Sequence, residues 1–141
     1  AQTSMRIEKG FCAMGHELDG DVSPVEAGLD FATRRTGGFI GSDALTDRRA
    51  QGATPRVVSL MFDDGDAMPL GHEPIYHAGR IIGQTSSCAY GYRVGAPVGL
   101  GHVDAPVMAG TQVQVDIAGT PCNAVIRHGP LFDPDGARMK G

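Results

Sequence analysis

The sequence predicts an α+β segment followed by an all-β domain, a small antiparallel β-barrel. Before residue 52 there are two short helical patterns, whereas after Pro55 short apolar runs alternate with turn residues. Residues 111–117, TQVQVDI, alternate strictly between polar and apolar side chains, which is typical of a half-buried strand. Six such runs within about 75 residues favour a closed barrel, because closure removes exposed sheet edges.

The first helical pattern runs from Ser23 to Gly28. Ser23 is a suitable N-cap, Pro24 fits the first helical position, and Glu26 has the spacing of a capping box. Gly28 ends the pattern early. A helix of one or two turns is unstable alone, so this segment is expected to dock on something larger.

The second helical pattern covers residues 41–51, with Gly41 or Ser42 as its cap. Its charged side chains are interpreted as a solvated face. Residues 29–41, between the two helices, predict short extended pieces around a Gly-Gly turn.

Six strands are predicted beyond Pro55, each bounded by turn residues. A hairpin turn at Ala78-Gly79 joins the second strand to the third, and a turn containing Gly119 joins the last two. The strands are expected at residues 56–62, 73–77, 80–90, 99–105, 111–117 and 122–128.

A change in composition at residues 50–55 marks the best internal boundary and divides the chain into residues 1–52 and 55–141. The first part has too few large apolar side chains for a core of its own. We therefore expect it to pack on the barrel, or to be the remainder of a domain whose other half is missing.

Composition and charge exclude several classes of protein. The net charge of −4 argues against a nucleic-acid surface, which needs a basic patch. No apolar run approaches the roughly 20 residues of a membrane span, and the first residues lack the pattern of a signal peptide. Neither nucleic acid nor a membrane is an expected partner, and the cytoplasm is the expected compartment.

The residues typical of metal and covalent chemistry form no recognisable motif. Three cysteines without CxxC spacing and five scattered histidines predict reduced thiols and no metal site. The Asp63, Asp64 and Asp66 cluster resembles the opening of a calcium loop but lacks its closing glutamate, so it is interpreted as a solvated turn. A nucleophile elbow, a P-loop and a dinucleotide-binding glycine motif are also missing from the sequence.

The stretch MRIEKGFCAMGHELDGDVSPVEAGLDF, residues 5–31, resembles a signature of the tetrahydrofolate-binding aminomethyltransferase family. This family includes the T-protein of glycine cleavage and the folate portions of dimethylglycine and sarcosine dehydrogenases. The ending PLFDPDGARMKG also matches. The residues that carry the resemblance are Arg6, Glu8, Gly10, Gly15, Glu17, Leu18, Ser23, Pro24, Glu26, Gly28, Leu29, Phe39, Ile40, Gly41, Ala44 and Leu45.

In full members of the family this signature lies well past the middle of the chain. The resemblance therefore implies that our chain is the C-terminal part of a longer protein. Residues 1–52 would be the remnant of a mixed α/β folate-binding middle domain, and residues 55–141 would be the C-terminal β-barrel. The missing N-terminal portion of that protein is an expected partner.

The resemblance also implies a function, namely help in binding tetrahydrofolate during one-carbon transfer from a methylated glycine or aminomethyl donor. An arginine at the position of Arg6 helps to hold folate in the family, and its planar fork can pair a carboxylate through two hydrogen bonds. We expect Arg6 and Glu8 to bind folate. The family's catalytic residues lie in a first lobe that no position here matches, so we assign no catalytic residue and expect the chain alone to be inactive.

The branch of the family is suggested by Met5 to Phe11, MRIEKGF, which looks more like the flavin-linked dehydrogenases than the T-protein pattern Leu-Arg-x-Glu-Ala-Gly. FAD would then be a cofactor only if a flavin domain precedes this chain. Two alternatives stay open. One is a folate-dependent iron-sulphur maintenance protein, whose motif is similar to residues 9–17, and the other is a structural or interaction module without small-molecule activity.

Overall fold

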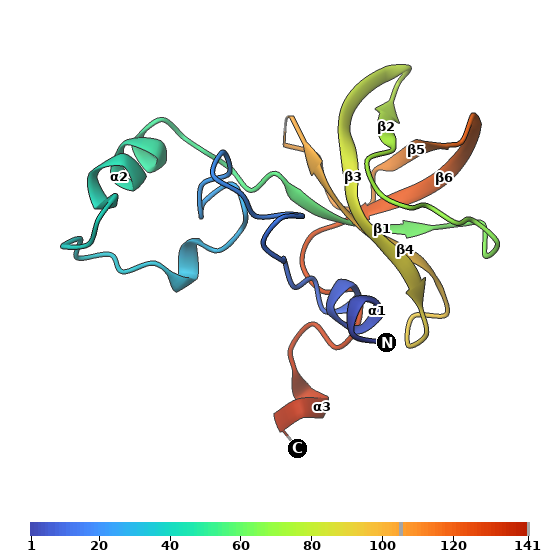
Figure 1. Ribbon diagram of the computed structural model, residues 1–141, viewed down its shortest axis with the longest axis horizontal. Helices are drawn as coiled ribbons and strands as arrows, with labels where there is room; N and C mark the ends of the chain where they lie inside the picture. Colours follow the sequence, from blue (N-terminus) through green and yellow to red (C-terminus); the bar gives the residue numbers. More distant parts are fainter. Residues whose placement is uncertain (105, 141) are drawn as a thin grey trace.

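The computed structural model describes residues 1–104 and 106–140. Six strands form a closed antiparallel barrel in the order β1-β4-β3-β2-β5-β6 (Figure 1). The predicted barrel is therefore confirmed. The strands are β1 (Val57–Phe62), β2 (Pro74–His77), β3 (Arg80–Gly91), β4 (Ala96–Val103), β5 (Gln112–Ile117) and β6 (Thr120–Arg127).

Five of the predicted strands agree with these bounds within two residues, and the strand expected at residues 99–105 differs most. It begins earlier, at Ala96, because Ala96 to Val98 continue the pairing with β3. Its expected last residue, 105, lies outside the described residues.

Two tight hairpin turns set the register of the barrel. In the β2–β3 turn, Ala78 has φ 49° and Gly79 has φ 77°, and in the β5–β6 turn, Ala118 has φ 51° and Gly119 has φ 84°. Two successive positive φ angles match the twist of the flanking strands. Both turns were predicted at these positions.

The barrel interior is filled by one apolar cluster, to which every strand except β3 contributes buried residues. On β5, Val113 and Val115 are buried while Gln112 and Gln114 are exposed, which confirms the predicted alternation. The cluster consists of Val58, Leu60, Phe62, Ile75, Val103, Val113, Val115, Cys122, Ala124 and Ile126.

Strands β3 and β4 approach each other more closely than side chains would allow. A Cβ atom placed on Gly83 would lie 1.9 Å from the carbonyl oxygen of His102, and one on Gly101 would lie 2.7 Å from that of Gln84. Only glycine fits at these positions, so the pair of glycines determines how tightly this side of the barrel is wound.

Helix α1 (Gln2–Glu8) packs against β3 and β4 and was not predicted from the sequence. It has seven residues, no side-chain cap and no acidic residue in its first turn. Its stability therefore comes from packing: Ile7 is fully buried against Val98 and Leu100, and the hydroxyl of Ser4 donates to the carbonyl of Tyr90 (2.6 Å).

The helix expected at residues 23–28 is a single hydrogen-bonded turn in the structure. The predicted capping box does form, since the amide of Ser23 donates to Glu26 Oε2 (3.0 Å) and the amide of Glu26 lies 3.3 Å from Ser23 Oγ. Gly28, with φ 73°, ends the turn before a second one can form.

The rest of the N-terminal segment extends away from the barrel (Figure 1). It contains the 3-10 helix η1 (Asp30–Ala32) and the helix α2 (Ser42–Ala50), of which α2 was predicted. The prediction of extended pieces in residues 29–41 was wrong. This stretch holds η1 and a series of turns, because glycines at positive φ bend it repeatedly.

The chain closes with α3 (Ala137–Lys140), and the residues before α3 return to α1. The amides of Leu131 and Phe132 both donate to the carbonyl oxygen of Glu8 (2.9 and 3.0 Å). The ammonium group of Lys9 donates to the carbonyl of Asp133 (2.7 Å). The two ends of the chain are thereby joined beside the barrel.

Candidate functional site

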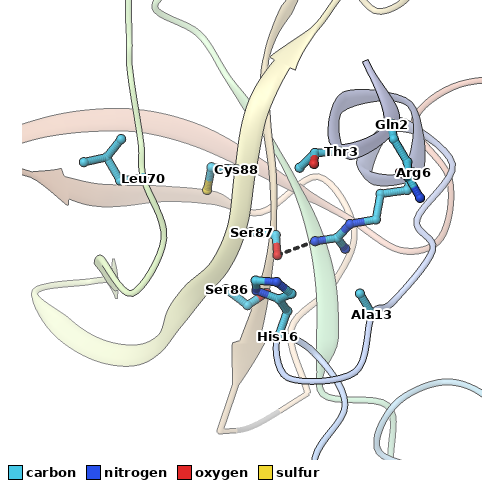
Figure 2. Close-up of a pocket in the computed structure, with 9 residues that line it drawn as sticks. All are labelled: Gln2, Thr3, Arg6, Ala13, His16, Leu70, Ser86, Ser87 and Cys88. Carbon is cyan, nitrogen blue, oxygen red and sulfur yellow. Dashed lines mark hydrogen bonds between the residues drawn. The ribbon is translucent and has the colours of Figure 1, made fainter.

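A cavity of about 400 Å³ lies between α1, the loop that follows it and strand β3 (Figure 2). Its walls come from three parts of the chain, namely residues 2–16, Leu70 and residues 86–88. Most of the lining side chains are polar or small. It is lined by Gln2, Thr3, Arg6, Ala13, His16, Leu70, Ser86, Ser87 and Cys88.

The guanidinium group of Arg6 extends from α1 toward β3 in this cavity (Figure 2). Its Nη1 donates to the carbonyl of Phe11 (3.0 Å) and to Glu17 Oε2 (2.8 Å), and its Nη2 donates to the hydroxyl of Ser87 (2.6 Å). Among the described residues these bonds use three of the five N–H donors of the side chain. The remaining two donors have no partner among the described residues, and Arg6 lines the cavity.

Glu17, the partner of Arg6, is completely buried. Its Oε1 accepts a hydrogen bond from the hydroxyl of Ser86 (2.6 Å), and its Oε2 accepts one from the amide of Ala13 (3.0 Å). Burial alone would raise the pKa of Glu17, but the hydrogen bonds from Ser86, Ser87 and Ala13 and the charge of Arg6 together lower it. Arg6, which lines the cavity, is therefore paired with an ionised, buried carboxylate.

Glu8 lies elsewhere, although the sequence placed it in the same motif as Arg6. Its side chain is buried, and its Oε1 accepts hydrogen bonds from the amides of Arg93 (2.7 Å) and Val94 (3.0 Å). Residues two apart on a helix project in different directions, so the structure does not bring Arg6 and Glu8 together. Glu8 fixes the β3–β4 turn beneath α1.

Sequence reasoning missed the role of Glu17, Ser86 and Ser87. Glu17 was one of the motif residues but carried no assignment, because nothing in the sequence pairs it with Arg6. The two serines lie far from the motif in sequence, and only the closure of the barrel places them beside it. The run of three polar residues within a predicted strand, Thr85 to Ser87, marks the place in the sequence, but their burial is seen only in the structure.

Cys88 also lines the cavity, and its chemistry follows from its surroundings. Burial, with smaller contributions from the nearby charges of Glu73 and Glu17, raises the pKa of its thiol to about 12. The thiol is therefore neutral at physiological pH and a weak nucleophile. Cys12 and Cys122 are free as well, which agrees with the prediction of reduced thiols.

A second cavity, of about 630 Å³, lies between the N-terminal segment and β1. Its lining is mainly apolar and includes Phe11, Phe31, Leu100 and Pro130. Phe31 is 83% exposed, and Ile40, in the same N-terminal segment, is fully exposed. The N-terminal segment thus presents large apolar side chains that the described residues leave uncovered.

Within residues 1–104 and 106–140, no group of three or more His, Cys, Asp or Glu side chains could hold a metal ion. In the same residues, no helix has both the length and the apolar character needed to cross a membrane.

Comparisons with known proteins agree with this architecture. Residues 56–133 match the family described as the glycine cleavage T-protein C-terminal barrel domain. The crystal structure of the glycine cleavage system aminomethyltransferase T from Bartonella henselae superposes with a TM-score of 0.83 at 24% identity. The match covers 95% of our chain and 38% of that one, and it shows the fold.

Two curated relatives are similar over nearly the whole chain. Human mitochondrial dimethylglycine dehydrogenase is 34% identical over 134 residues, which is 93% of our chain and 16% of that protein. The aminomethyltransferase of Rippkaea orientalis is 30% identical over 135 residues, which is 94% of our chain and 36% of that protein. Our chain thus spans between about a sixth and just over a third of the length of these relatives.

The barrel topology, the family match across more than half of the residues and the similarity beyond it agree with one another. They also confirm the resemblance that the sequence suggested. The chain belongs to the family of glycine cleavage T-protein C-terminal barrel domains, the C-terminal part of aminomethyltransferase-type proteins.

Proposed function

We propose that this chain forms one wall of a tetrahydrofolate site in a longer aminomethyltransferase-type protein. There it would help to bind folate while a one-carbon unit is transferred from a methylated glycine or another aminomethyl donor. The family membership supports the general class of protein. The contacts of Arg6 support the specific role in folate binding.

The observation that carries the proposal is the position of Arg6 at the cavity wall. Three contacts hold its guanidinium group, and among the described residues two of its donors have no partner. Reduced folates carry a glutamate tail with carboxylates and a pterin with carbonyl and ring nitrogen acceptors. A planar, always charged donor fork suits either type of acceptor better than a lysine would.

Glu8 stays in the proposal as a residue of the folate site. Its effect would be indirect, because its side chain is buried beneath α1. By holding the amides of Arg93 and Val94, it fixes the end of α1 against the β3–β4 turn. The orientation of α1 in turn determines where the Arg6 side chain enters the cavity. We therefore expect Glu8 to influence folate binding through geometry.

We assign no catalytic residue to this chain and propose that the reactive groups come from the missing N-terminal portion. The exposed Phe31 and Ile40 support such a partner, because apolar side chains of this size are usually covered. In such a site catalysis depends on positioning two reactants and excluding water, and a wall that anchors folate contributes to both.

The amine substrate is proposed from the relatives. Besides human dimethylglycine dehydrogenase, 4-methylaminobutanoate oxidase (formaldehyde-forming) of Paenarthrobacter nicotinovorans is 31% identical over 143 residues. These names favour a methylated amine and the flavin-linked branch, in which FAD would be held by a preceding domain. We propose a cytoplasmic location and no nucleic-acid or membrane partner.

The proposal is tested by measuring tetrahydrofolate affinity by calorimetry in the longer polypeptide that carries this chain. Arg6→Ala should weaken binding by about tenfold or more, the range for a lost hydrogen bond to a charged group. Arg6→Lys should restore only part of the affinity, because it keeps the charge but not the fork. Arg35→Ala is the matched control, since Arg35 is exposed and pairs with Asp30. An unchanged dissociation constant in Arg6→Ala would remove Arg6 from the site.

A further inference from the structure

We infer that Glu17 is a positioning residue for folate binding: its carboxylate locks the guanidinium of Arg6 in the orientation that presents the free donors to the cavity. This inference rests on the function proposed above. It adds to that function the carboxylate that orients the guanidinium group of Arg6.

Glu17 is fixed by the loop that it belongs to. The amide of Ala13 donates to Glu17 Oε2, and the amide of Glu17 donates back to the carbonyl of Ala13 (3.2 Å). Gly15, with φ 81°, allows the tight turn between them, and a bridge between Met14 and Leu18 closes it. The carboxylate is therefore part of a small, rigid loop and cannot turn away from Arg6 at low cost.

An irregularity in β3 supplies the second support. The register of β3 against β4 shifts between Thr85 and Ser87, so that Ser86 is an extra residue in the ladder. Successive side chains of a regular strand point to opposite faces, but at a bulge two neighbours can share one. Ser86 and Ser87 both line the cavity, where Ser86 donates to Glu17 and Ser87 accepts from Arg6.

Arg6 is thus held at three points of its planar group, by Phe11, Glu17 and Ser87. Only Glu17 carries a charge, and its completely buried carboxylate lies 2.8 Å from Nη1. A hydrogen bond between two charged groups in such surroundings is stronger than the two that Arg6 makes to neutral acceptors. Removing the charge leaves Arg6 with two neutral acceptors and frees its head group to rotate toward solvent.

A purely structural role would be different in a measurable way. If Glu17 served only to close the loop at residues 13–18, its loss would disturb folate binding whether or not Arg6 were present. If it acts through Arg6, its loss should matter only while Arg6 is there. A double-mutant cycle separates the two cases.

The experiment uses Glu17→Gln, which keeps the size and one acceptor but removes the charge. In the 141-residue chain, nitrogen-15 NMR of arginine side chains reports whether the Arg6 guanidinium rotates. We expect separate Nη1 and Nη2 signals for Arg6 in the wild type and one averaged signal in Glu17→Gln. Glu26→Gln is the control, because Glu26 makes a similar set of local hydrogen bonds away from the cavity. It should leave the Arg6 signals unchanged.

The second arm measures tetrahydrofolate dissociation constants in the longer polypeptide. Glu17→Gln should weaken binding about tenfold in the presence of Arg6 and less than about twofold in an Arg6→Ala background, a coupling typical of residues in contact. Equal losses in both backgrounds, or unchanged Arg6 signals, would overturn the inference. If Arg6→Ala alone left the affinity unchanged, the proposed function would fail, whereas the NMR arm would still report whether Glu17 holds Arg6.

Ser86→Ala provides a milder variant if Glu17→Gln does not fold. It removes the hydroxyl that donates to Glu17 Oε1 without removing the charge. We expect a partial effect in the same direction in both arms. If Glu17→Gln does not fold and Ser86→Ala keeps both the separate Arg6 signals and the full affinity, the inference is contradicted.

Discussion

The Nη1 atom of Arg6 lies 2.8 Å from Oε2 of Glu17, and the carboxylate side of this ion pair is completely buried while the cation is 16% exposed. The pair joins α1 to the loop that follows it, and through the serines it joins both to β3. A charged group in this position makes the stability of the N-terminal segment dependent on pH.

Acid should weaken the fold through Glu17. Its pKa is lowered below the ordinary value of 4.5, so the unfolded chain takes up the proton first. The stability that it contributes is complete above the unfolded-state pKa and is lost as the pH falls through the folded-state pKa. We expect the free energy of unfolding in urea to decrease between about pH 5 and pH 3, and to decrease less steeply in Glu17→Gln. Identical slopes in the two proteins would contradict this.

Glu8 should matter more for stability than its place in the folate motif suggests. Glu8→Ala leaves the amides of Arg93 and Val94 without their acceptor, at a cost of about 1–3 kcal/mol. Glu8→Gln keeps a carbonyl oxygen at the same place and should lose less. Urea unfolding of both variants measures the difference. Equal stabilities of Glu8→Ala and Glu8→Gln would show that these hydrogen bonds contribute little.

The chain alone should bind tetrahydrofolate weakly or undetectably and transfer no carbon unit. Only one wall of the proposed site is present. The volume of the cavity beside Arg6, about 400 Å³, lies toward the lower end of the range for ligand pockets. Calorimetry with the chain and tetrahydrofolate checks this. A dissociation constant in the micromolar range would contradict it and would move the complete site into these residues.

Cys88 should resist alkylation in the folded protein. With a pKa of about 12, only about one thiol in ten thousand is ionised at pH 8, and the thiolate is the reacting form. We expect iodoacetamide to modify Cys88 far more slowly in the native chain than in urea, as read by mass spectrometry. The alkylation rate of Cys12 serves as the internal comparison. The pKa of its thiol is also raised, but the thiol is less buried than that of Cys88. Equal native rates for the two would contradict the stated environment of Cys88.

Gly83→Ala should destabilise the barrel by about 2 kcal/mol or more, because overpacking forces the backbone to shift. The added Cβ would lie 1.9 Å from the carbonyl of His102, a backbone atom in the neighbouring strand. Gly65→Ala is the control, since a Cβ there meets open space and its change should stay within about 0.5 kcal/mol. Urea unfolding of both gives the comparison, and similar stabilities would refute the close approach.

The barrel could be predicted because its strands and turns have recognisable local sequence patterns. The alternation in residues 111–117 and the Gly-containing turns after Ala78 and Ala118 depend on neighbouring residues alone. The capping box at Ser23 and Glu26 was readable for the same reason, even though the turn it opens does not grow into a helix.

Helix α1 and the arrangement around Arg6 could not be predicted in the same way. The propensity of QTSMRIE is weak, and the helix forms because Ile7 packs against the barrel. Glu17 and Ser87 meet Arg6 only after β3 has found its place in the sheet. Such contacts depend on the tertiary fold and leave no spacing in the sequence that reveals them.

The contacts of Glu8 have a consequence for how the protein is made. Its carbonyl oxygen receives the amides of Leu131 and Phe132, which leave the ribosome more than a hundred residues later. A seven-residue helix does not persist alone, so α1 stays unfolded on the nascent chain until these later residues have emerged. The helix is thus ordered only after the barrel that follows it in the chain has been synthesised, and any partner that needs α1 in place must wait for the barrel.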